Sequence, residues 1–228
     1  MKPIGADART LTSHVLQTLR NAILEGLLEP ERPIKIEEVA RELNVSAIPV
    51  REAVLRLVSE GFVVSEPHKG YKVAPVSKAD LVDIYTVRLM LEPEAARQAV
   101  GLLTERDIED LTRLQTQIVA STETKTPTDT LAATREFHFR LYGILGSSRL
   151  LSTIAILWDQ SERYRRLYVA KRERGSEVVE EHKRILTECI KRQPDRCAQA
   201  VVDDLNRTIS ALMAQLGSSE TVSSAEVI

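Results

Sequence analysis

The chain has 228 residues, of which 43% are hydrophobic and 28% charged, and a formal net charge of −2. This composition is typical of a chain with a buried core, which excludes wholesale disorder, and the length suits one large domain or two small ones. No apolar run approaches the roughly 18 residues that span a bilayer, and no signal-peptide stretch opens the chain, so we expect no membrane contact. Two cysteines, Cys189 and Cys197, are too few for a disulfide scaffold and fit a reducing cytoplasm.

With nine glycines and nine prolines, the composition favours helices over sheets, and the first predicted elements are helical. Residues 1–9 show no periodicity and are expected to form a flexible leader. Apolar residues at three- and four-residue steps predict a helix over residues 11–26, which Thr10 or Thr12 can cap. A turn with two prolines follows, and then a short helix over residues 36–44.

A third helix is predicted after the corner at Val45. Ser46 fits its N-cap, with the hydroxyl placed to accept a hydrogen bond from a free backbone N–H, and Gly61 ends it. Two short β-branched runs over residues 62–64 and 71–74 then predict a β-hairpin. This order of elements is that of a winged helix-turn-helix, in which the third helix enters the major groove of DNA and the hairpin tip contacts the backbone or the minor groove.

Residues 77–216 predict a second domain that is entirely helical. Six helical segments are expected, over about 78–101, 104–122, 128–146, 149–170, 173–192 and 194–216. The fold class is therefore mostly α, with a winged helix-turn-helix at residues 10–76 followed by an antiparallel six-helix bundle. The polar residues 217–228 are expected to form a disordered tail.

Several side chains of the first domain are placed to contact DNA. Arg51 projects from the first turns of the third helix, where a guanidinium can bind guanine bidentately or hold a phosphate. Lys69 lies at the hairpin tip and suits contact with the phosphate backbone. The residues expected to contact DNA are Ser46, Ala47, Ile48, Arg51, His68, Lys69 and Gly70. The alternative is a protein-interaction module of the same shape, with a solvated charged surface.

Five segments of this domain carry a family resemblance: Leu19–Gly26, Glu38-Val39-Ala40, Val45–Val54, Gly61-Phe62-Val63 and the turn Lys69-Gly70. Together they resemble the DNA-binding domain of the GntR family of bacterial transcription regulators. Many members have an arginine directly after the capping serine, where this chain has Ala47. The resemblance implies a homodimer that binds a palindromic double-stranded DNA operator. With Ala47 in place of that arginine, either the operator sequence differs from those of other members, or the affinity depends on Arg51 and the wing.

Two histidines lie on apolar helix faces of the second domain. His138 lies on the inner stripe of the helix over residues 128–146, and His182 lies on that of the helix over residues 173–192. Because such faces can converge inside a bundle, the two imidazoles could share a metal ion. Histidines that only pack in the core are the alternative.

Three segments of this domain, Val87–Ala96, Glu136-Phe137-His138 and Glu181–Leu186, carry a second resemblance. They resemble signatures of the effector-binding FCD domain of the FadR subfamily, and the six helices are similar to its VanR-type branch. That branch holds a divalent metal with one aspartate and three histidines; His138 and His182 match, whereas Thr134 and Asp204 replace the other two ligands. The resemblance implies a site for Zn, Ni, Mn or Fe made of these residues.

Basic and aromatic residues on the inner helix stripes could bind an effector. An unpaired guanidinium at Arg88, on an apolar stripe, would be costly, so Arg88 pairs either with a ligand carboxylate or with a structural glutamate. Arg165 follows Trp158 by seven residues and can face inward with it, although a solvated charged face is the alternative. The expected effector-binding residues are Arg88, Trp158 and Arg165.

These features predict a ligand-responsive transcription regulator, by analogy a repressor, and not an enzyme. The second domain would bind a small carboxylic acid, directly or through the metal, and favour one arrangement of the homodimer. A helical metalloenzyme is one alternative, but the sequence shows no nucleophile constellation or cofactor loop. A helical interaction module without a small ligand is the other.

Overall fold

The computed structural model describes residues 6–123, 127–169 and 175–223. The chain divides into two compact units between Ser77 and Lys78, close to the domain boundary expected at residue 76. None of the described helices combines the length and the apolar content needed to cross a bilayer.

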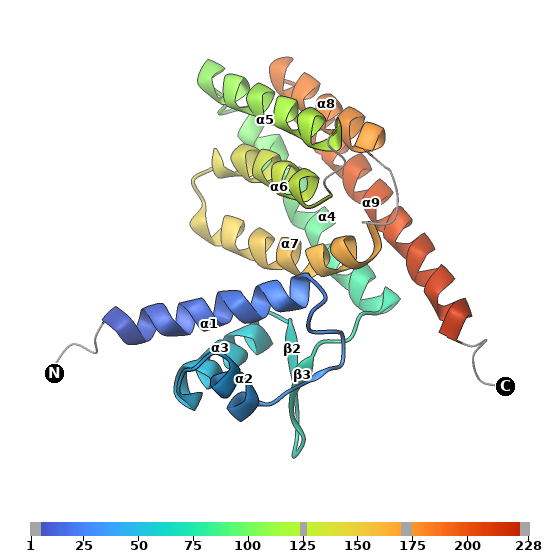
Figure 1. Cartoon of the computed structure of the whole chain (residues 1–228). Coiled ribbons are helices and arrows are strands. Elements are labelled where there is room, and N and C mark those ends of the chain that lie inside the picture. The colour runs from blue at the N-terminus through green and yellow to red at the C-terminus, as the bar shows by residue number, and fades with distance from the viewer. Residues whose placement is uncertain (1–5, 124–126, 170–174, 224–228) are drawn as a thin grey trace. The chain divides into compact units, whose positions relative to one another are not determined.

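The N-terminal unit contains three helices and three short strands in the described residues (Figure 1). They are α1 (Ala6–Leu24), β1 (Pro33–Ile34), α2 (Ile36–Glu42), α3 (Ala47–Ser59), β2 (Val63–Glu66) and β3 (Gly70–Val73). The strands form an antiparallel sheet in the order β1-β3-β2, with Ile34 opposite Tyr71 and Val63 opposite Val73. The predicted winged helix-turn-helix is confirmed, and β1 is an additional strand that the sequence did not indicate.

Helix α1 begins at Ala6, inside the expected leader and before the expected caps at Thr10 or Thr12. The predicted start of the helix at residue 11 is therefore wrong. Alanine is the strongest helix former, and the alanines at positions 6 and 8 favour helix before the apolar period begins.

Helix α3 presents its apolar side to the core of this unit, where Val50, Val54 and Leu57 pack with residues of α1 such as Val15 and Leu19. The opposite side of α3 is therefore left on the surface.

Ser46 occupies the N-cap of α3 with an extended backbone (φ −73°, ψ 161°), but its hydroxyl makes no capping hydrogen bond. The predicted cap contact is wrong. Because this helix end is exposed, water can satisfy the backbone N–H groups instead.

The turn between β2 and β3 exposes His68 and Lys69 to solvent, as does Gly70 at the start of β3. Gly70 has a φ of +95° and His68 a φ of +63°, backbone conformations that favour glycine and are uncommon for other residues. An ion pair of 2.6 Å between Lys72 Nζ and Glu66 Oε1 joins the two strands. The wing tip is therefore exposed, while its base is fixed by strand pairing.

The C-terminal unit contains six helices in the described residues. They are α4 (Lys78–Val100), α5 (Glu105–Glu123), α6 (Pro127–Gly143), α7 (Ser148–Val169), α8 (Gly175–Ile190) and α9 (Pro194–Ser223). Helix α4 packs against α7 and α9, while α5 packs against α6 and α8 (Figure 1). This arrangement confirms the predicted helical domain.

Two helix ends differ from the prediction. Helix α6 ends at Gly143 rather than at residue 146, since Gly143 and Gly146 weaken the helix and Gly146 has a φ of +63°. Helix α9 runs to Ser223, so the predicted disordered tail from residue 217 begins too early, and residues 224–228 lie outside the described residues. The Gly217-Ser218-Ser219 run lowers helix propensity without ending the helix.

Cys189 of α8 and Cys197 of α9 are buried as free thiols, with 3.6 Å between their sulfur atoms. They pack the two helices together near the short connection that joins them. The structure thus places both where small apolar side chains are needed.

Candidate functional site

The C-terminal unit brings three metal-binding side chains together from three helices. His138 of α6, His182 of α8 and Asp204 of α9 each offer a ligand atom, and these atoms all lie within 4.8 Å of one another. All three residues are buried, with side-chain exposures of 1% for His138 and 10% for Asp204. Among the described residues they are the group of histidine, cysteine and acidic side chains that could hold a metal ion.

The ring of His138 is oriented by a neighbour on its own helix. Nδ1 lies 3.0 Å from the Tyr142 hydroxyl oxygen, one helical turn away. The opposite nitrogen, Nε2, is buried without a hydrogen-bond partner among the described residues and lies 3.5 Å from Asp204 Oδ2. Nε2 therefore faces the point where the three side chains converge.

The ring of His182 is oriented in the same sense. Its Nδ1 donates a hydrogen bond of 2.8 Å to the Val178 carbonyl oxygen, which can only accept. Its Nε2 is then the unprotonated nitrogen of the neutral ring, and it too is buried without a hydrogen-bond partner in the described part of the chain. The centroids of the two imidazoles are 4.9 Å apart.

Burial keeps both imidazoles neutral. Desolvation lowers the pKa of His138 well below its usual value, and the nearby His182, Arg88 and Arg165 lower it further. Desolvation also lowers the pKa of His182, although Asp204 opposes this effect. A neutral imidazole is the form that ligates a metal, so the two buried lone pairs and the carboxylate fit a divalent cation.

Thr134, the fourth residue expected at this site, has a different partner. Its buried hydroxyl donates a hydrogen bond of 3.0 Å to the Leu131 carbonyl oxygen of its own helix. The structure therefore accounts for Thr134 as a helix residue with a satisfied hydroxyl.

Arg88 of α4 is held by a structural glutamate. Its side chain is 2% exposed and binds Glu92 in bidentate fashion, with Nε 2.5 Å from Oε1 and Nη2 3.3 Å from Oε2. Nη1 donates to the Ser161 hydroxyl at 2.9 Å, and the guanidinium lies 4.4 Å from the Trp158 ring centroid. These contacts favour the structural alternative for Arg88 over a role in binding an effector.

Arg165 of α7 is a basic residue beside the site whose guanidinium is available to bind a ligand. Its guanidinium lies 5.2 Å from the Trp158 ring centroid, and its charge lowers the pKa of both His138 and His182. Arg165 is half-buried and has no hydrogen-bond or ion-pair partner among the described residues. Trp158 is buried against His138, with ring centroids 5.2 Å apart, so Trp158 and Arg165 both lie beside the histidines.

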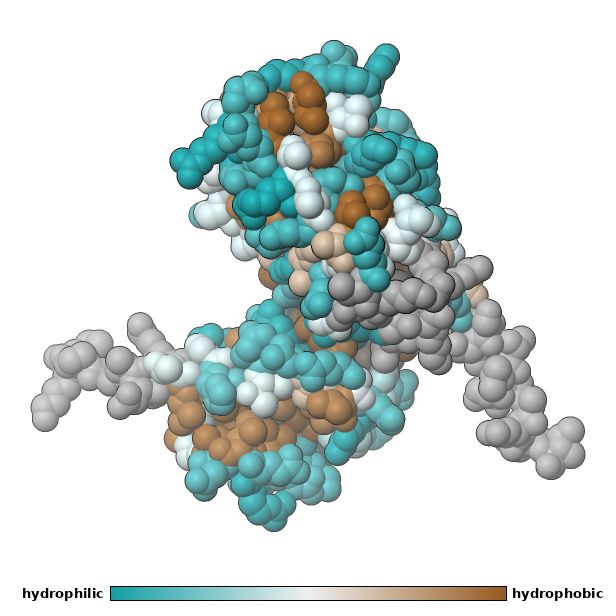
Figure 2. Space-filling model, turned by 45° about the horizontal axis from the view of Figure 1, so that its top comes forward, coloured by the Kyte–Doolittle hydropathy of each residue, from teal (hydrophilic) through white to brown (hydrophobic). Residues whose placement is uncertain are grey.

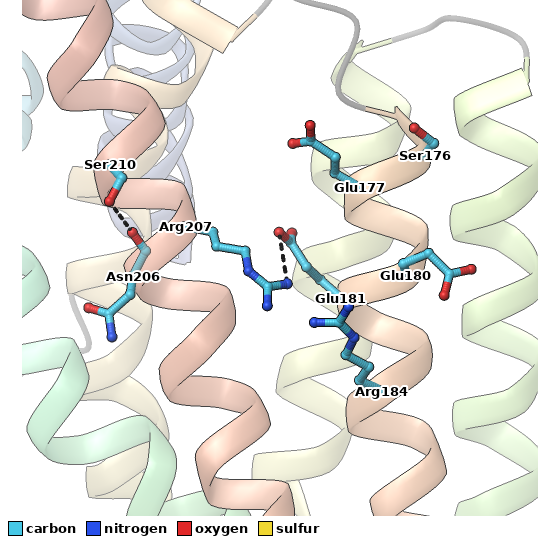
Figure 3. A pocket seen from close by; sticks show the side chains of 8 residues that line it. All are labelled: Ser176, Glu177, Glu180, Glu181, Arg184, Asn206, Arg207 and Ser210. Atoms are coloured by element: carbon cyan, nitrogen blue, oxygen red, sulfur yellow. Dashed lines mark hydrogen bonds and ion pairs between the residues drawn. The ribbon is translucent and has the colours of Figure 1, made fainter.

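A pocket of about 700 Å³ opens between α8 and α9. Its lining residues are Ser176, Glu177, Glu180, Glu181, Arg184, Asn206, Arg207 and Ser210. In Figure 3, Glu181 and Arg207 point toward one another across this space, with Glu181 Oε1 3.7 Å from Arg207 Nη1. Because three carboxylates oppose two guanidiniums, the lining does not favour an anionic ligand.

The N-terminal unit presents a second candidate surface, on α3 and the wing. Arg51 is exposed and its side chain has no hydrogen-bond or ion-pair partner among the described residues. The unit carries exposed hydrophobic surface (Figure 2), and Ile48 of α3 has an exposed fraction of 70%. Ala47 is half-buried at the first position of α3, while Ser46 and Lys69 are exposed.

Sequence reasoning missed the residues that connect Arg88 to His138. Glu92 lies within the signature Val87–Ala96, and Tyr142 lies one turn after the signature that contains His138. Both follow a site residue by four positions, Arg88 to Glu92 and His138 to Tyr142, which places each pair on one helix face. That spacing was the available signal.

A winged helix-turn-helix that exposes an arginine on its third helix, followed by a helical unit with a buried cluster of two histidines and an aspartate, is typical of a DNA-binding transcription regulator. Comparison with known proteins gives the same class. Residues 11–73 match the family of bacterial regulatory proteins called the gntR family, and residues 83–207 match the FCD domain.

Relatives and solved structures agree with these matches. The chain is 29% identical over 225 residues to the HTH-type transcriptional regulator BphR of Paraburkholderia xenovorans, covering 91% of this chain and 87% of that protein. It is 30% identical to the Nta operon transcriptional regulator of Aminobacter aminovorans, covering 81% of this chain and 86% of that protein. The structure of Escherichia coli McbR/YncC superposes with a TM-score of 0.78 at 26% identity, covering 90% of this chain and 98% of that one.

The chain therefore belongs to the GntR family of bacterial transcription regulators and carries an FCD domain. It is a regulator and not an enzyme, as its relatives and its fold agree.

Proposed function

We propose that the protein is a homodimeric repressor whose affinity for DNA changes when a small carboxylic acid binds at a metal centre. The observation that carries the ligand part is the convergence of two buried, unpartnered Nε2 atoms and one carboxylate on a single point. Apolar burial of three such groups is costly unless a cation binds them. With a cation bound, this cluster would give the protein a site at which a ligand can bind and change its activity.

His138, His182 and Asp204 would hold the metal. Two imidazoles and a carboxylate suit Zn, Ni, Mn or Fe, and such a set leaves coordination positions for an outside ligand. The bound metal would supply a positive centre that attracts the carboxylate group of an acid. Thr134 contributes no ligand in this proposal, because its hydroxyl donates to the backbone.

Arg165 would bind the same acid. Its guanidinium is half-buried beside Trp158 and close enough to both histidines to lower their pKa values. A guanidinium binds a carboxylate through two parallel hydrogen bonds, and partial burial strengthens that pairing. Metal and Arg165 together therefore favour an acid with at least one carboxylate and disfavour cations.

On the N-terminal unit, α3 would lie in the major groove. Arg51 would read guanine or hold a phosphate, and the exposed Ile48 would contact a thymine methyl group. Lys69, His68 and Gly70 of the wing, together with Ser46 at the start of α3, would contact the phosphate backbone. Ala47 offers no polar contact, so specificity would depend on its neighbours.

Two copies on a two-fold symmetric operator would place two α3 helices about one turn of DNA apart. An operator that overlaps a promoter would then block transcription. An acid that binds one dimer arrangement better than the other changes affinity for DNA, and about 1–3 kcal/mol of coupling suffices.

Thermal unfolding of the full chain tests the ligand part. After chelation, Zn²⁺ is added back, followed by a panel of small mono-, di- and tricarboxylates. We expect Zn²⁺ to raise the melting temperature of the wild type but not of His138→Ala, since a ligand that binds the folded state stabilises it. At least one carboxylate should raise it further, and only with Zn²⁺ present.

Arg165→Ala and Arg149→Ala separate the acid from the metal. Arg149 is exposed near the start of the same helix, so Arg149→Ala removes one arginine from α7 as Arg165→Ala does and is its matched control. Arg165→Ala should keep the response to Zn²⁺ and lose the response to the acid, while Arg149→Ala keeps both. No response of the wild type to Zn²⁺ would contradict the metal centre.

A further inference from the structure

A continuous chain of buried hydrogen bonds joins α4 to the candidate metal ligand on α6. It runs from Arg88 through Glu92 and Tyr142 to His138, and each of these side chains is at most 2% exposed. Tyr142 Oη lies 3.0 Å from Glu92 Oε2 and 3.0 Å from His138 Nδ1. The Tyr142 hydroxyl thus lies between a carboxylate and an imidazole.

The direction of every hydrogen bond in this chain follows from its donors. Arg88 and the indole N–H of Trp158, 3.1 Å from Glu92 Oε2, can only donate, so the Glu92 carboxylate accepts from both. Tyr142 must then donate its single proton to Glu92, because a carboxylate beside Arg88 has none to give. The lone pairs of the hydroxyl oxygen are left facing His138.

His138 therefore donates to Tyr142 from Nδ1. A neutral imidazole carries one proton, so a proton on Nδ1 leaves Nε2 unprotonated, with its lone pair at the point shared with His182 and Asp204. Asp204 Oδ2, 3.5 Å from Nε2, acts in the opposite direction, because a carboxylate there would favour a proton on Nε2. Two acceptors thus compete for one proton.

We propose that Tyr142 is a positioning residue that, oriented by Glu92, holds His138 in the Nδ1–H tautomer and so prepares Nε2 to bind the metal. Tyr142 itself does not touch the metal position. The inference rests on the metal centre proposed above and adds a residue that controls its affinity. Partners of this kind on a metal-binding histidine typically change metal affinity by about 10- to 100-fold.

The tautomer can be observed without a metal. The chain contains four histidines, and His14 and His68 are exposed, so ¹⁵N-histidine labelling of the full chain gives few and distinct ring signals. Long-range ¹H–¹⁵N spectra of the chelated protein show which ring nitrogen carries the proton. We expect the Nδ1–H form for His138 in the wild type and a shift toward Nε2–H in Tyr142→Phe.

Two internal comparisons keep the test specific. His182 donates from Nδ1 to a backbone carbonyl, so its tautomer should be unchanged in Tyr142→Phe. Tyr164→Phe removes another fully buried hydroxyl of the same unit, one that bonds to Asp80, and should leave His138 as in the wild type. A general loosening of the unit would instead move both histidines.

Titration of the same proteins with Zn²⁺ gives the second measurement. Tyr142→Phe should bind Zn²⁺ about 10- to 100-fold more weakly than the wild type, and Tyr164→Phe should bind it equally well. A wild-type His138 protonated on Nε2 would overturn the inference even if Tyr142→Phe failed to fold. Equal Zn²⁺ affinity with an unchanged tautomer in Tyr142→Phe would overturn it too.

The outcomes separate this inference from the proposed function. If the wild type binds no Zn²⁺ but His138 shows the Nδ1–H tautomer that changes in Tyr142→Phe, the metal centre fails and the positioning role of Tyr142 on the ring stands. If Zn²⁺ binds and the tautomer is independent of Tyr142, the positioning role fails and the metal centre stands.

Discussion

Single residues decide whether the helical unit can hold a metal, and His138 is the clearest case. His138→Ala removes one imidazole from a cluster of three candidate ligands, so we expect Zn²⁺ affinity to fall below detection in calorimetric titration. Thr134→Ala is the matched control, because Thr134 is buried on the same helix and its hydroxyl donates to the backbone. Thr134→Ala should keep the wild-type affinity, and an equal loss in both variants would mean that Thr134 is a ligand after all.

Arg51 is the corresponding residue for DNA. Arg51→Ala should nearly abolish sequence-specific binding, because it removes the one guanidinium in the first turns of α3. Arg56→Ala is the control, since Arg56 is exposed on the same helix about 140° further around its axis. Gel-shift titrations on a specific site and on an unrelated duplex distinguish the two, and equal specific binding by wild type and Arg51→Ala would refute the role of α3.

Spacing on the apolar helix faces predicted the two histidines, and the family resemblance implied Asp204, but neither indicated how the buried charges pair. Arg88 illustrates the limit: its place on an apolar stripe required a partner, yet the sequence could not choose between a ligand and a glutamate. The choice depends on Glu92, one turn along α4, and on Ser161 and Trp158 of α7, which only the packing of α4 against α7 brings near.

At the scale of an element, α5 begins with a reciprocal cap. The Thr104 backbone N–H donates to Asp107 Oδ2 at 2.7 Å, and the Asp107 backbone N–H donates to the Thr104 hydroxyl at 3.2 Å. Arg140 of α6 also binds the Asp107 carboxylate. The hydrogen bonds from Thr104, followed by those from Arg140, lower the pKa of Asp107 to about 2.

Asp107→Asn should therefore destabilise the protein by about 0.3–1 kcal/mol near neutral pH, because it removes the negative charge near the helix N-terminus that pairs with Arg140, while the amide oxygen can still accept from Thr104. The folded pKa lies below the unfolded one, so this stabilisation is present above about pH 4 and is lost as the pH falls toward 2. Urea unfolding at pH 6 and pH 3 checks this, with Asp83→Asn, at an exposed site of α4, as control. A difference between wild type and Asp107→Asn that grows at pH 3 would contradict it.

The wing makes a separate prediction about DNA. Lys69→Ala should weaken binding to all sequences alike and reduce the slope of log affinity against log salt by about 1, because it removes one phosphate contact. Anisotropy titrations at several salt concentrations measure both quantities. A loss confined to one sequence would indicate a base contact instead.

Most elements were predicted within a few residues, because long amphipathic helices carry a strong periodic signal. Strand β1 has only two residues, Pro33 and Ile34, and its existence depends on pairing with β3, which lies far along the chain. The predictions for the start of α1 and the end of α9 were wrong because these polar segments carry no apolar period.

Across the whole molecule, the chain joins a winged helix-turn-helix unit to an FCD domain, and α4 begins directly after the first unit ends. The same helix carries Arg88 and Glu92. Glu92 accepts a hydrogen bond from Tyr142, which in turn contacts His138. If ligand binding at the metal centre changes DNA affinity, linkage requires that operator DNA change the affinity for the acid by the same factor. Calorimetric titration of the acid with and without operator DNA tests this reciprocity.

Selection from random duplexes shows whether this chain binds a two-fold symmetric DNA site. The full-length protein, with and without Zn²⁺, is mixed with a random duplex pool, and the bound fraction is sequenced over several rounds. We predict enrichment of one short inverted repeat with half-sites about one helical turn apart, and no enrichment with Arg51→Ala. No enriched motif under either condition would contradict sequence-specific regulation, and a motif without two-fold symmetry would contradict the homodimer.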